Sequence, residues 1–400
     1  MFRGVSSMKI LHVISSADPA GGGPIEGVKQ LTLVAQANGH SIEIASLDPP
    51  EAPYLKGFPA PVHALGPARF KYRFSDRLLP WLRTHATRYD IAIVEGIWQY
   101  HSFAVRQALH RSPIPYVVFT HGMLDPWFKR TYPLKHLKKW LYWPWGDYRV
   151  LRDADAVLFT CEEEMLLARQ SFWLYSAREK VVTYGTTAPS ANLDAERQNA
   201  LSRFPELRGK RIILFMGRIH PKKGCDLVVK AFARTLATDP NWHLVMAGPD
   251  QIGWKASLCA MAAELNIADR ITWTGMVVGD AKYGLLAASE AMFLPSHQEN
   301  FGVIVAEALA CGVPVLISVK VNIWREVKTD GAGLVANDNL SGACELLRNW
   351  MAMDAEERQS MRGRARNCFE KRFEIHRASD CLISALQAVQ NQKIMLSSAA

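Results

Sequence analysis

The chain has 400 residues, 49% hydrophobic and 21% charged, a composition typical of a globular protein with two domains. No run approaches 18 consecutive apolar residues and the first seven residues lack an apolar core, so we expect neither a transmembrane helix nor a secretory leader. Seven scattered cysteines without metal-ligand spacing predict reduced thiols and a cytoplasmic location.

The net charge of +9 is a local feature of the chain. Residues 69–88 and residues 129–149 each carry six basic residues against one acidic residue. The remainder is therefore close to neutral, and an anionic partner would bind at these two stretches.

Strand-like apolar runs alternate with helical stretches through the first half of the chain. This alternation predicts an α/β fold with a doubly wound parallel sheet. The expected strands are Lys9–Ile14, Ile42–Ala45, Ile91–Val94, Tyr116–Phe119, Ala156–Phe159 and Val181–Thr183.

The loop after the first strand closes on Gly21, Gly22 and Gly23, and Pro24 then suits the first turn of a helix. Glycines here would let a ligand approach the backbone and leave the first helix amides free, although a flexible turn has the same composition. The three glycines are contiguous, so they do not form the spaced dinucleotide fingerprint.

A second candidate loop follows the strand Tyr116–Phe119 and carries His121 before Gly122. A lone histidine is more often structural. The carboxyl end of a parallel strand is where open α/β sheets bind ligands, and this position makes His121 a candidate site residue.

Residues 125–148 mix aromatic and basic side chains. We expect a helix with lysines on one side, beside two tryptophans. This mixture suits a bilayer interface or a nucleic acid, and the alternative is a core-packing helix with a solvated basic face. The residues expected on that side are Lys135, Lys138, Lys139, Trp140 and Trp143.

Residues 184–210 are expected to form a linker to a second domain, which begins with the strand Arg211–Met216. Arg218 and Lys223 then bracket a tight turn before the helix Asp226–Leu236. Two cations beside a helix N-terminus would bind a pyrophosphate, whereas the alternative is a basic surface loop.

Two more strands of this domain end in candidate ligand-facing loops. The strand His243–Ala247 ends at Gly248, and the strand Ile271–Thr274 ends before Met276. Helical sequence follows at Leu340–Arg366 and at Phe373–Gln392.

Residues 291–316 are the most informative stretch of the chain. A short apolar strand ends before a polar loop that contains Glu299, and a helix then carries Glu307 between apolar neighbours. A carboxylate in such surroundings is costly to bury unless it is hydrogen-bonded. The amides around Gly302, at the start of the helix, favour an anion in the loop. The ordinary alternative is a solvated Glu299 and a structural Glu307.

This stretch resembles the signature of retaining glycosyltransferases of family 4, which have the two-domain GT-B fold. The shared features are the spacing of Glu299 and Glu307, the pair Phe301-Gly302 after the first glutamate, and Gly312-Val313-Pro314-Val315 after the helix. The turn from Arg218 to Lys223 resembles the second signature of the family.

The resemblance implies a role for each candidate residue. Glu299 would contact the donor sugar, Glu307 the ribose hydroxyls, and His121 the transferring sugar. Arg218 and Lys223 would neutralise the leaving diphosphate, so that neither a metal nor another cofactor is needed. The amides around Asn300, Phe301 and Gly302 would hold the sugar or distal phosphate, Gly248 and Met276 would lie beside the nucleobase, and Gly21, Gly22 and Gly23 would lie against the diphosphate or acceptor.

The fold implied is α/β, with two Rossmann-like, doubly wound parallel-sheet domains facing across a cleft. Residues 1–188 would bind the acceptor and residues 209–372 the nucleotide-sugar donor. The helix at 375–392 would cross back and pack on the first domain.

The function implied is transfer of a sugar from a nucleotide-diphosphate donor, taken to be mannose from GDP-mannose, with retention of configuration. The acceptor would be a glycan or lipid-linked glycan in lipopolysaccharide or surface polysaccharide synthesis. Residues 69–88 and 129–149 would hold the protein on the anionic inner face of the cytoplasmic membrane, with no nucleic-acid partner. The rival functions are a GT-B-fold nucleotide-sugar epimerase and a non-catalytic protein that binds membrane or nucleic acid.

Overall fold

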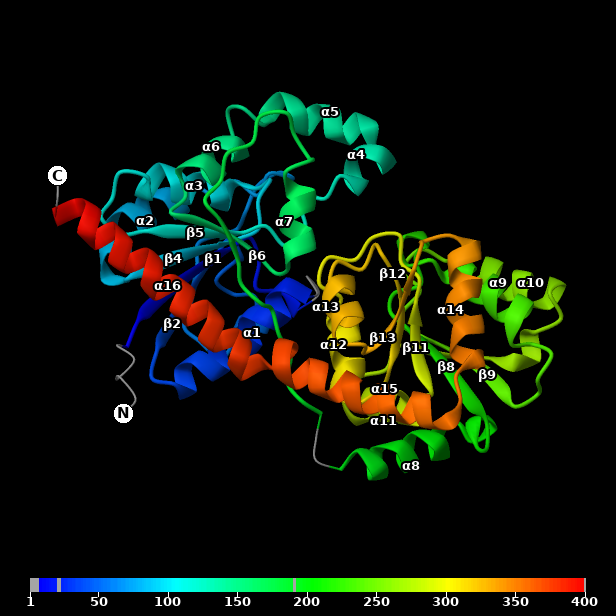
Figure 1. Cartoon of the computed structure of the whole chain (residues 1–400). Helices are drawn as coiled ribbons and strands as arrows, with labels where there is room; N and C mark the ends of the chain where they lie inside the picture. Colours follow the sequence, from blue (N-terminus) through cyan, green and yellow to red (C-terminus); the bar gives the residue numbers. More distant parts are fainter. Residues whose placement is uncertain (1–6, 20–22, 190–191, 399–400) are drawn as a thin grey trace. The chain divides into compact units, whose positions relative to one another are not determined.

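The computed structural model describes residues 7–19, 23–189 and 192–398. The chain divides into two compact units (Figure 1). One contains the chain up to Gly185 together with the last helix, α16 (Ile375–Ser398), and the other is Thr186–Glu374.

The first unit is built on a seven-stranded parallel sheet of order β3-β2-β1-β4-β5-β6-β7. The central strands are almost entirely buried because helices cover both faces, which explains their continuous apolar sequences. The strands are β1 (Lys9–Ile14), β2 (Ser41–Ser46), β3 (Val62–Ala64), β4 (Ile91–Glu95), β5 (Tyr116–Phe119), β6 (Ala156–Phe159) and β7 (Glu179–Val181).

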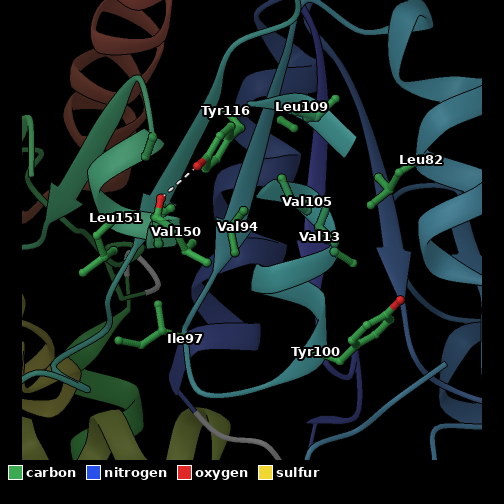
Figure 2. Packing of buried hydrophobic residues seen from close by; sticks show 14 of the residues in the cluster. Val13, Leu82, Val94, Ile97, Tyr100, Val105, Leu109, Tyr116, Val150 and Leu151 are labelled. Atoms are coloured by element: carbon green, nitrogen blue, oxygen red, sulfur yellow. Dashed lines mark hydrogen bonds between the residues drawn. The ribbon is translucent and has the colours of Figure 1, made fainter. Parts of the chain in front are cut away.

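Apolar side chains from strands and helices form the core of this unit. Figure 2 shows Val13 and Val94 from the sheet beside Val105 and Leu109 of α3 (Tyr100–Leu109). The hydroxyl of Tyr116 is buried and donates a hydrogen bond to the main-chain oxygen of Val150 at 2.8 Å. The helices are α1 (Gly23–Ala37), α2 (Leu78–His85), α3 (Tyr100–Leu109), α4 (Trp127–Thr131), α5 (Pro133–Tyr142), α6 (Asp147–Asp153), α7 (Glu162–Ala168) and α16.

The second unit has a six-stranded parallel sheet of order β10-β9-β8-β11-β12-β13. Its strands are β8 (Arg211–Met216), β9 (Trp242–Ala247), β10 (Ile271–Gly275), β11 (Ala291–Leu294), β12 (Val315–Ser318) and β13 (Gly333–Ala336). Its helices are α8 (Leu193–Arg203), α9 (Cys225–Thr235), α10 (Lys255–Glu264), α11 (Gly279–Ala288), α12 (Val303–Ala310), α13 (Trp324–Thr329), α14 (Leu340–Ala352) and α15 (Ala355–Cys368).

The predicted α/β fold with two parallel sheets is confirmed. The predicted return of the last helix is confirmed too, because α16 packs on α1 within the first unit (Figure 1). None of the helices in the described ranges is long and apolar enough to span a bilayer.

Several predicted elements differ from the observed ones. The linker expected at 184–210 contains α8, which packs so closely on α11 that a side chain on Gly284 would collide with the main-chain oxygen of Glu196. The strand predicted at Val181–Thr183 lies two residues earlier, and β3 and β13 were not predicted. The helical stretch Leu340–Arg366 is two helices, because Asp354 begins α15 with a capping box.

Candidate functional site

The loop that follows β8 is shaped by two glycines in the second unit. Gly217 and Gly248 both have positive φ, and a side chain on Gly248 would collide with the main-chain oxygen of Gly217. The loop after β9 therefore lies directly against the loop that carries Arg218. The guanidinium of Arg218 is exposed and donates to Oε1 of Gln251 at 3.4 Å.

Gly224 brings this turn against the end of β11. It has φ +67° and begins α9, and a side chain here would collide with the main-chain oxygen of Pro295. The amide of His297 also donates to the main-chain oxygen of Lys222 at 2.8 Å. The two motifs that resemble the family signatures are therefore held together by main-chain contacts.

Lys223 and Glu299 form a direct ion pair across these two loops. Lys223 is only 9% exposed, so this residue does not belong to a solvated basic surface loop, the alternative considered for this turn. Burial, with Lys222 and Arg218 nearby, lowers the pKa of Lys223, and the carboxylate of Glu299 opposes that effect. The ammonium group of Lys223 and the carboxylate of Glu299 thus lie where they can bind a polar ligand, at the carboxyl ends of the neighbouring strands β8 and β11.

Main-chain hydrogen bonds hold Glu299 from the side of β12. Its amide donates to Lys320 O at 2.9 Å, and its carbonyl accepts from the amide of Asn322 at 3.0 Å. The Asn322 side chain also contacts Oδ1 of Asn300 at 3.4 Å. This backbone pairing fixes the direction of the Glu299 side chain, which the spacing of the motif alone does not specify.

The start of α12 places the next two candidates. Phe301 is buried and packs edge-on against Phe373, while Gly302 has φ +73° and stands at the N-cap of the helix. The glycine conformation lets the chain turn from the Glu299 loop into the helix, and a side chain on Gly302 would lie only 3.2 Å from Cγ of Glu299.

Glu307 is a buried carboxylate one turn further along α12, and Nζ of Lys282 lies 2.6 Å from its Oε1. The apolar neighbours of Glu307 imply a free-energy cost of burying its carboxylate. The ion pair with Lys282 of α11 offsets this cost. Lys282 was not among the predicted residues, because a contact between α11 and α12 leaves no local trace in the sequence. Met276, expected beside a nucleobase, is strongly exposed in the loop after β10.

His121 lies in the first unit, directly after β5, in a strained backbone conformation. Its φ is +47° and that of Gly122 is +71°, an arrangement uncommon for a non-glycine residue. The loop is held by Glu164 of α7, whose Oε1 accepts from Thr120 Oγ1 at 2.7 Å and from the Gly122 amide at 2.6 Å. Strain maintained by a buried carboxyl group is typical of functional sites.

Glu95, at the end of β4, is a further candidate residue that our sequence analysis missed. Its Oε2 lies 2.6 Å from Nε2 of His121. The rule that selected His121, a polar residue before glycine at the end of a buried strand, applies equally to Glu95 and Gly96. Of the predicted glycine loop, Gly21 and Gly22 lie outside the described residues, and Gly23 is the first residue of α1.

The basic aromatic stretch divides into a buried side and an exposed side. Trp143 is fully buried and stacks on Phe172 with ring centroids 4.2 Å apart, so its expected place on the exposed side is wrong. Lys139 is wrongly placed as well, because its ammonium lies 4.2 Å from the centre of the Trp98 ring and burial lowers its pKa. Lys135, Lys138 and Trp140 are exposed, as expected. Large apolar side chains that were not predicted are exposed beside them, namely Leu134, Leu137, Leu141 and Trp145.

No group of three or more His, Cys, Asp or Glu side chains in the described ranges is arranged to hold a metal ion. That the reaction needs no metal stays a prediction.

Two known families match the chain. Residues 197–368 match the family "Glycosyl transferases group 1", and residues 22–185 match "Glycosyl transferase 4-like domain". A curated relative, D-inositol 3-phosphate glycosyltransferase of Nocardia farcinica, is 30% identical over 200 residues, which make up 48% of this chain and 43% of that protein. The chain thus spans less than half the length of this relative.

Solved structures share the whole architecture at low sequence identity. Sucrose-phosphate synthase from Thermosynechococcus elongatus has a TM-score of 0.70 at 18% identity, with 98% of each chain covered. A protein from Anabaena, solved with UDP and glucose, has a TM-score of 0.71 at 16% identity, with 98% of this chain and 100% of that chain covered. These likenesses establish the GT-B fold.

Proposed function

Because the chain joins a glycosyl transferase 4-like domain to a glycosyl transferases group 1 domain on the GT-B fold, we propose that it is a nucleotide-sugar-dependent glycosyltransferase. The donor would bind at the carboxyl ends of β8 and β11 in the second unit. The observation that carries this proposal is the ion pair of the buried Lys223 with the partly buried Glu299, held between two loops whose glycines allow close backbone approach.

A nucleotide diphosphate sugar fits this pair because it presents both an anion and hydroxyl donors. The diphosphate would draw the ammonium of Lys223 away from Glu299, and Arg218 is exposed nearby to complete the neutralisation. Glu299 would then accept hydrogen bonds from sugar hydroxyls. Glu307 would accept from the ribose hydroxyls, with Lys282 holding its carboxylate.

We propose that the transfer retains the configuration of the donor. The bond between the anomeric carbon and the diphosphate breaks, the acceptor oxygen bonds to the same face of that carbon, and the acceptor proton passes to the departing phosphate oxygen. Lys223 and Arg218 would stabilise the charge that grows on the leaving group. The proposed donor is GDP-mannose, with UDP-glucose as the competing candidate because the Anabaena structure holds UDP and glucose.

The proposed acceptor is a lipid-linked or surface glycan of the lipopolysaccharide type, reached by binding to an anionic membrane. Exposed leucines and tryptophans of α5 and its C-terminal flank lie beside Lys135 and Lys138, the mixture that favours a bilayer interface. The two basic stretches meet here, because the hydroxyls of Tyr72 and Tyr142 are 2.8 Å apart. Phe70, two residues before Tyr72, is also strongly exposed.

The proposal is tested by thermal unfolding with a panel of nucleotide sugars and the matching nucleoside diphosphates. A donor at 100 times its dissociation constant should stabilise the protein by about 2.7 kcal/mol. The Lys223→Ala variant is the matched control, in which the same ligands should raise the melting temperature much less. A panel that leaves the wild-type melting temperature unchanged contradicts the proposal.

A further inference from the structure

Two histidines of the first unit bind the same buried carboxylate. Glu95 Oε2 lies 2.6 Å from Nε2 of His121, and Glu95 Oε1 lies 2.7 Å from Nδ1 of His12. All three side chains are almost inaccessible to solvent. They come from β4, from the loop after β5 and from β1, which are neighbours in the sheet, so the cluster lies where three adjacent strands meet.

This cluster is poorly explained as packing. Apolar residues of similar volume are often as stabilising as a buried ion pair, or more so. The other four residues of β4 are apolar, and Glu95 departs from that pattern at the strand's carboxyl end. Buried titratable groups at such a position are candidates for a role in function.

The charge of Glu95 determines which nitrogen of each ring carries a proton. Burial alone would raise the pKa of Glu95, but the hydrogen bonds from His12 and His121 lower it to about 2. Glu95 is therefore ionised at neutral pH and accepts a hydrogen bond from each ring. A neutral His121 then carries its proton on Nε2, which makes Nδ1 the acceptor nitrogen.

Other contacts keep the carboxylate and the His121 loop in place. His101 is buried, and its Nε2 donates to the main-chain oxygen of Glu95 at 3.0 Å. Burial lowers the pKa of His101 to about 4, so this ring adds no charge to the cluster at neutral pH. Glu164 holds the strained backbone on the other side of His121.

We propose that Glu95 is a positioning residue that holds His121 as the Nε2–H tautomer, so that Nδ1 meets a hydroxyl of the transferring sugar, and that His12 fixes Glu95 in turn. The proposal rests on the proposed glycosyltransfer, in which His121 contacts the sugar. An orienting carboxylate behind a functional histidine is a recurrent arrangement in enzymes, and its loss leaves the ring in the wrong tautomer.

The first test is the Glu95→Gln variant. Its carboxamide presents an accepting oxygen to one histidine and a donating NH₂ group to the other. We expect kcat to fall about 10²-fold, as for a misplaced reacting group, while KM for the donor changes less than about twofold. The matched control is Glu43→Gln, because Glu43 of β2 also binds a histidine, His63 at 2.7 Å, and the hydroxyl of Tyr89 at 2.6 Å. The control should keep its kcat.

A double-mutant cycle then separates positioning from general damage to the fold. If Glu95 acts through His121, the Glu95→Gln/His121→Ala double variant should be no slower than His121→Ala alone. Losses of kcat that multiply in the double variant overturn the proposal, as does a Glu95→Gln variant with wild-type kcat.

The tautomer can be measured directly on the wild-type protein. A two-dimensional ¹H–¹⁵N spectrum of the histidine side chains at neutral pH, assigned with His121→Ala, should show His121 protonated on Nε2. Protonation on Nδ1 overturns the proposal even if the enzyme is active. If no nucleotide sugar is consumed, the proposed function fails, and this spectrum still decides the role of Glu95.

Discussion

At the scale of single residues, an ammonium group as buried as that of Lys223 needs a counter-charge close by. Glu299 supplies it, so the pair is held in place before any ligand arrives. The sequence motifs identified both residues, but they are 76 positions apart and nothing in either motif shows that the two side chains meet. The pairing could be seen only once β8 and β11 were placed side by side.

Alanine substitutions of Lys223 and Arg218 should therefore reduce the stability of the protein by different amounts. Arg218→Ala and Lys223→Ala should each reduce kcat roughly 10²–10³-fold, as expected for losing a stabiliser of developing charge. Lys223→Ala should also lower the free energy of unfolding by roughly 1–3 kcal/mol, because Glu299 loses its partner. Arg218 is exposed, so its replacement should leave stability nearly unchanged. Steady-state kinetics and denaturant unfolding measure both effects, and near-wild-type kcat in both variants would place the diphosphate elsewhere.

The two glutamates should separate sugar binding from nucleotide binding. Glu307→Gln should weaken the affinity for a nucleoside diphosphate, because its proposed partner is the ribose. Glu299→Gln should leave that affinity nearly intact while lowering kcat, because its proposed partner is the sugar. Calorimetric titration with UDP and GDP measures the difference, and equal losses of affinity in the two variants would contradict this assignment.

Asp147 should make the stability of the first unit depend on pH. Burial raises the pKa of Asp147 to about 7, against hydrogen bonds from Ser102 and the Trp98 amide and the charge of Lys139. A carboxyl group with a raised pKa binds its proton more tightly in the folded state, so stability falls as pH rises from about 4 to about 7. Asp147→Asn should remove this dependence. Urea unfolding of the wild type and of Asp147→Asn at pH 5 and pH 8 measures this dependence. Identical pH profiles of the free energy of unfolding would show that ionising Asp147 does not destabilise the fold.

At the scale of elements, the central strands could be predicted because burial on both faces makes their sequences continuously apolar. The failures fall on edge strands. β3 and β13 were missed and β7 was misplaced, and these three edge strands are only partly buried. β3 (Val-His-Ala) and β7 (Glu-Lys-Val) therefore lack the apolar run that identifies a strand, whereas the run in β13 (Gly-Leu-Val-Ala) is apolar but only four residues long.

The helix α5 shows why the exposed side of a helix is harder to predict than its existence. Lys139 and Trp143 lie one turn apart and face the core. There Lys139 packs on the ring of Trp98, and Trp143 stacks on Phe172. Nothing local in the sequence distinguishes them from Lys135, Lys138 and Trp140, because tertiary contacts decide which side is covered.

The exposed side of α5 should bind anionic vesicles. Each exposed lysine contributes about 1 kcal/mol near an anionic surface, and the attraction should weaken as salt rises. We expect co-sedimentation with vesicles of mixed neutral and anionic phospholipid at low salt, and loss of it in Lys135→Glu/Lys138→Glu. The matched control is Lys328→Glu/Arg348→Glu, an equal change of charge at exposed residues of the second unit.

The same vesicles test the apolar part of this surface. Leu134→Ser/Leu137→Ser should weaken sedimentation without changing the net charge, since both leucines are exposed. If the lysine and leucine variants both sediment as well as the wild type, the basic aromatic surface faces something other than lipid.

At the scale of the whole molecule, the alternation of strands and helices was sufficient to predict two parallel-sheet domains and the return of the last helix. The two motifs of the proposed donor site could be found because each occupies a single strand–loop–helix segment. The environment of His121 could not, because it combines β1, β4, β5 and α7. When the residues of a site come from segments far apart in the sequence, no fixed spacing between those residues can reveal the site.

The central claim is that the protein breaks the bond between a sugar and a nucleotide diphosphate with retention of configuration. Proton NMR of UDP-glucose and GDP-mannose incubated with the enzyme, with water as the acceptor, tests it without knowledge of the natural acceptor. We predict slow release of the α-anomer of the free sugar before mutarotation, with one nucleoside diphosphate per sugar, and none with Lys223→Ala. Release of the β-anomer first, an isomerised nucleotide sugar, or no release from either donor would contradict the account.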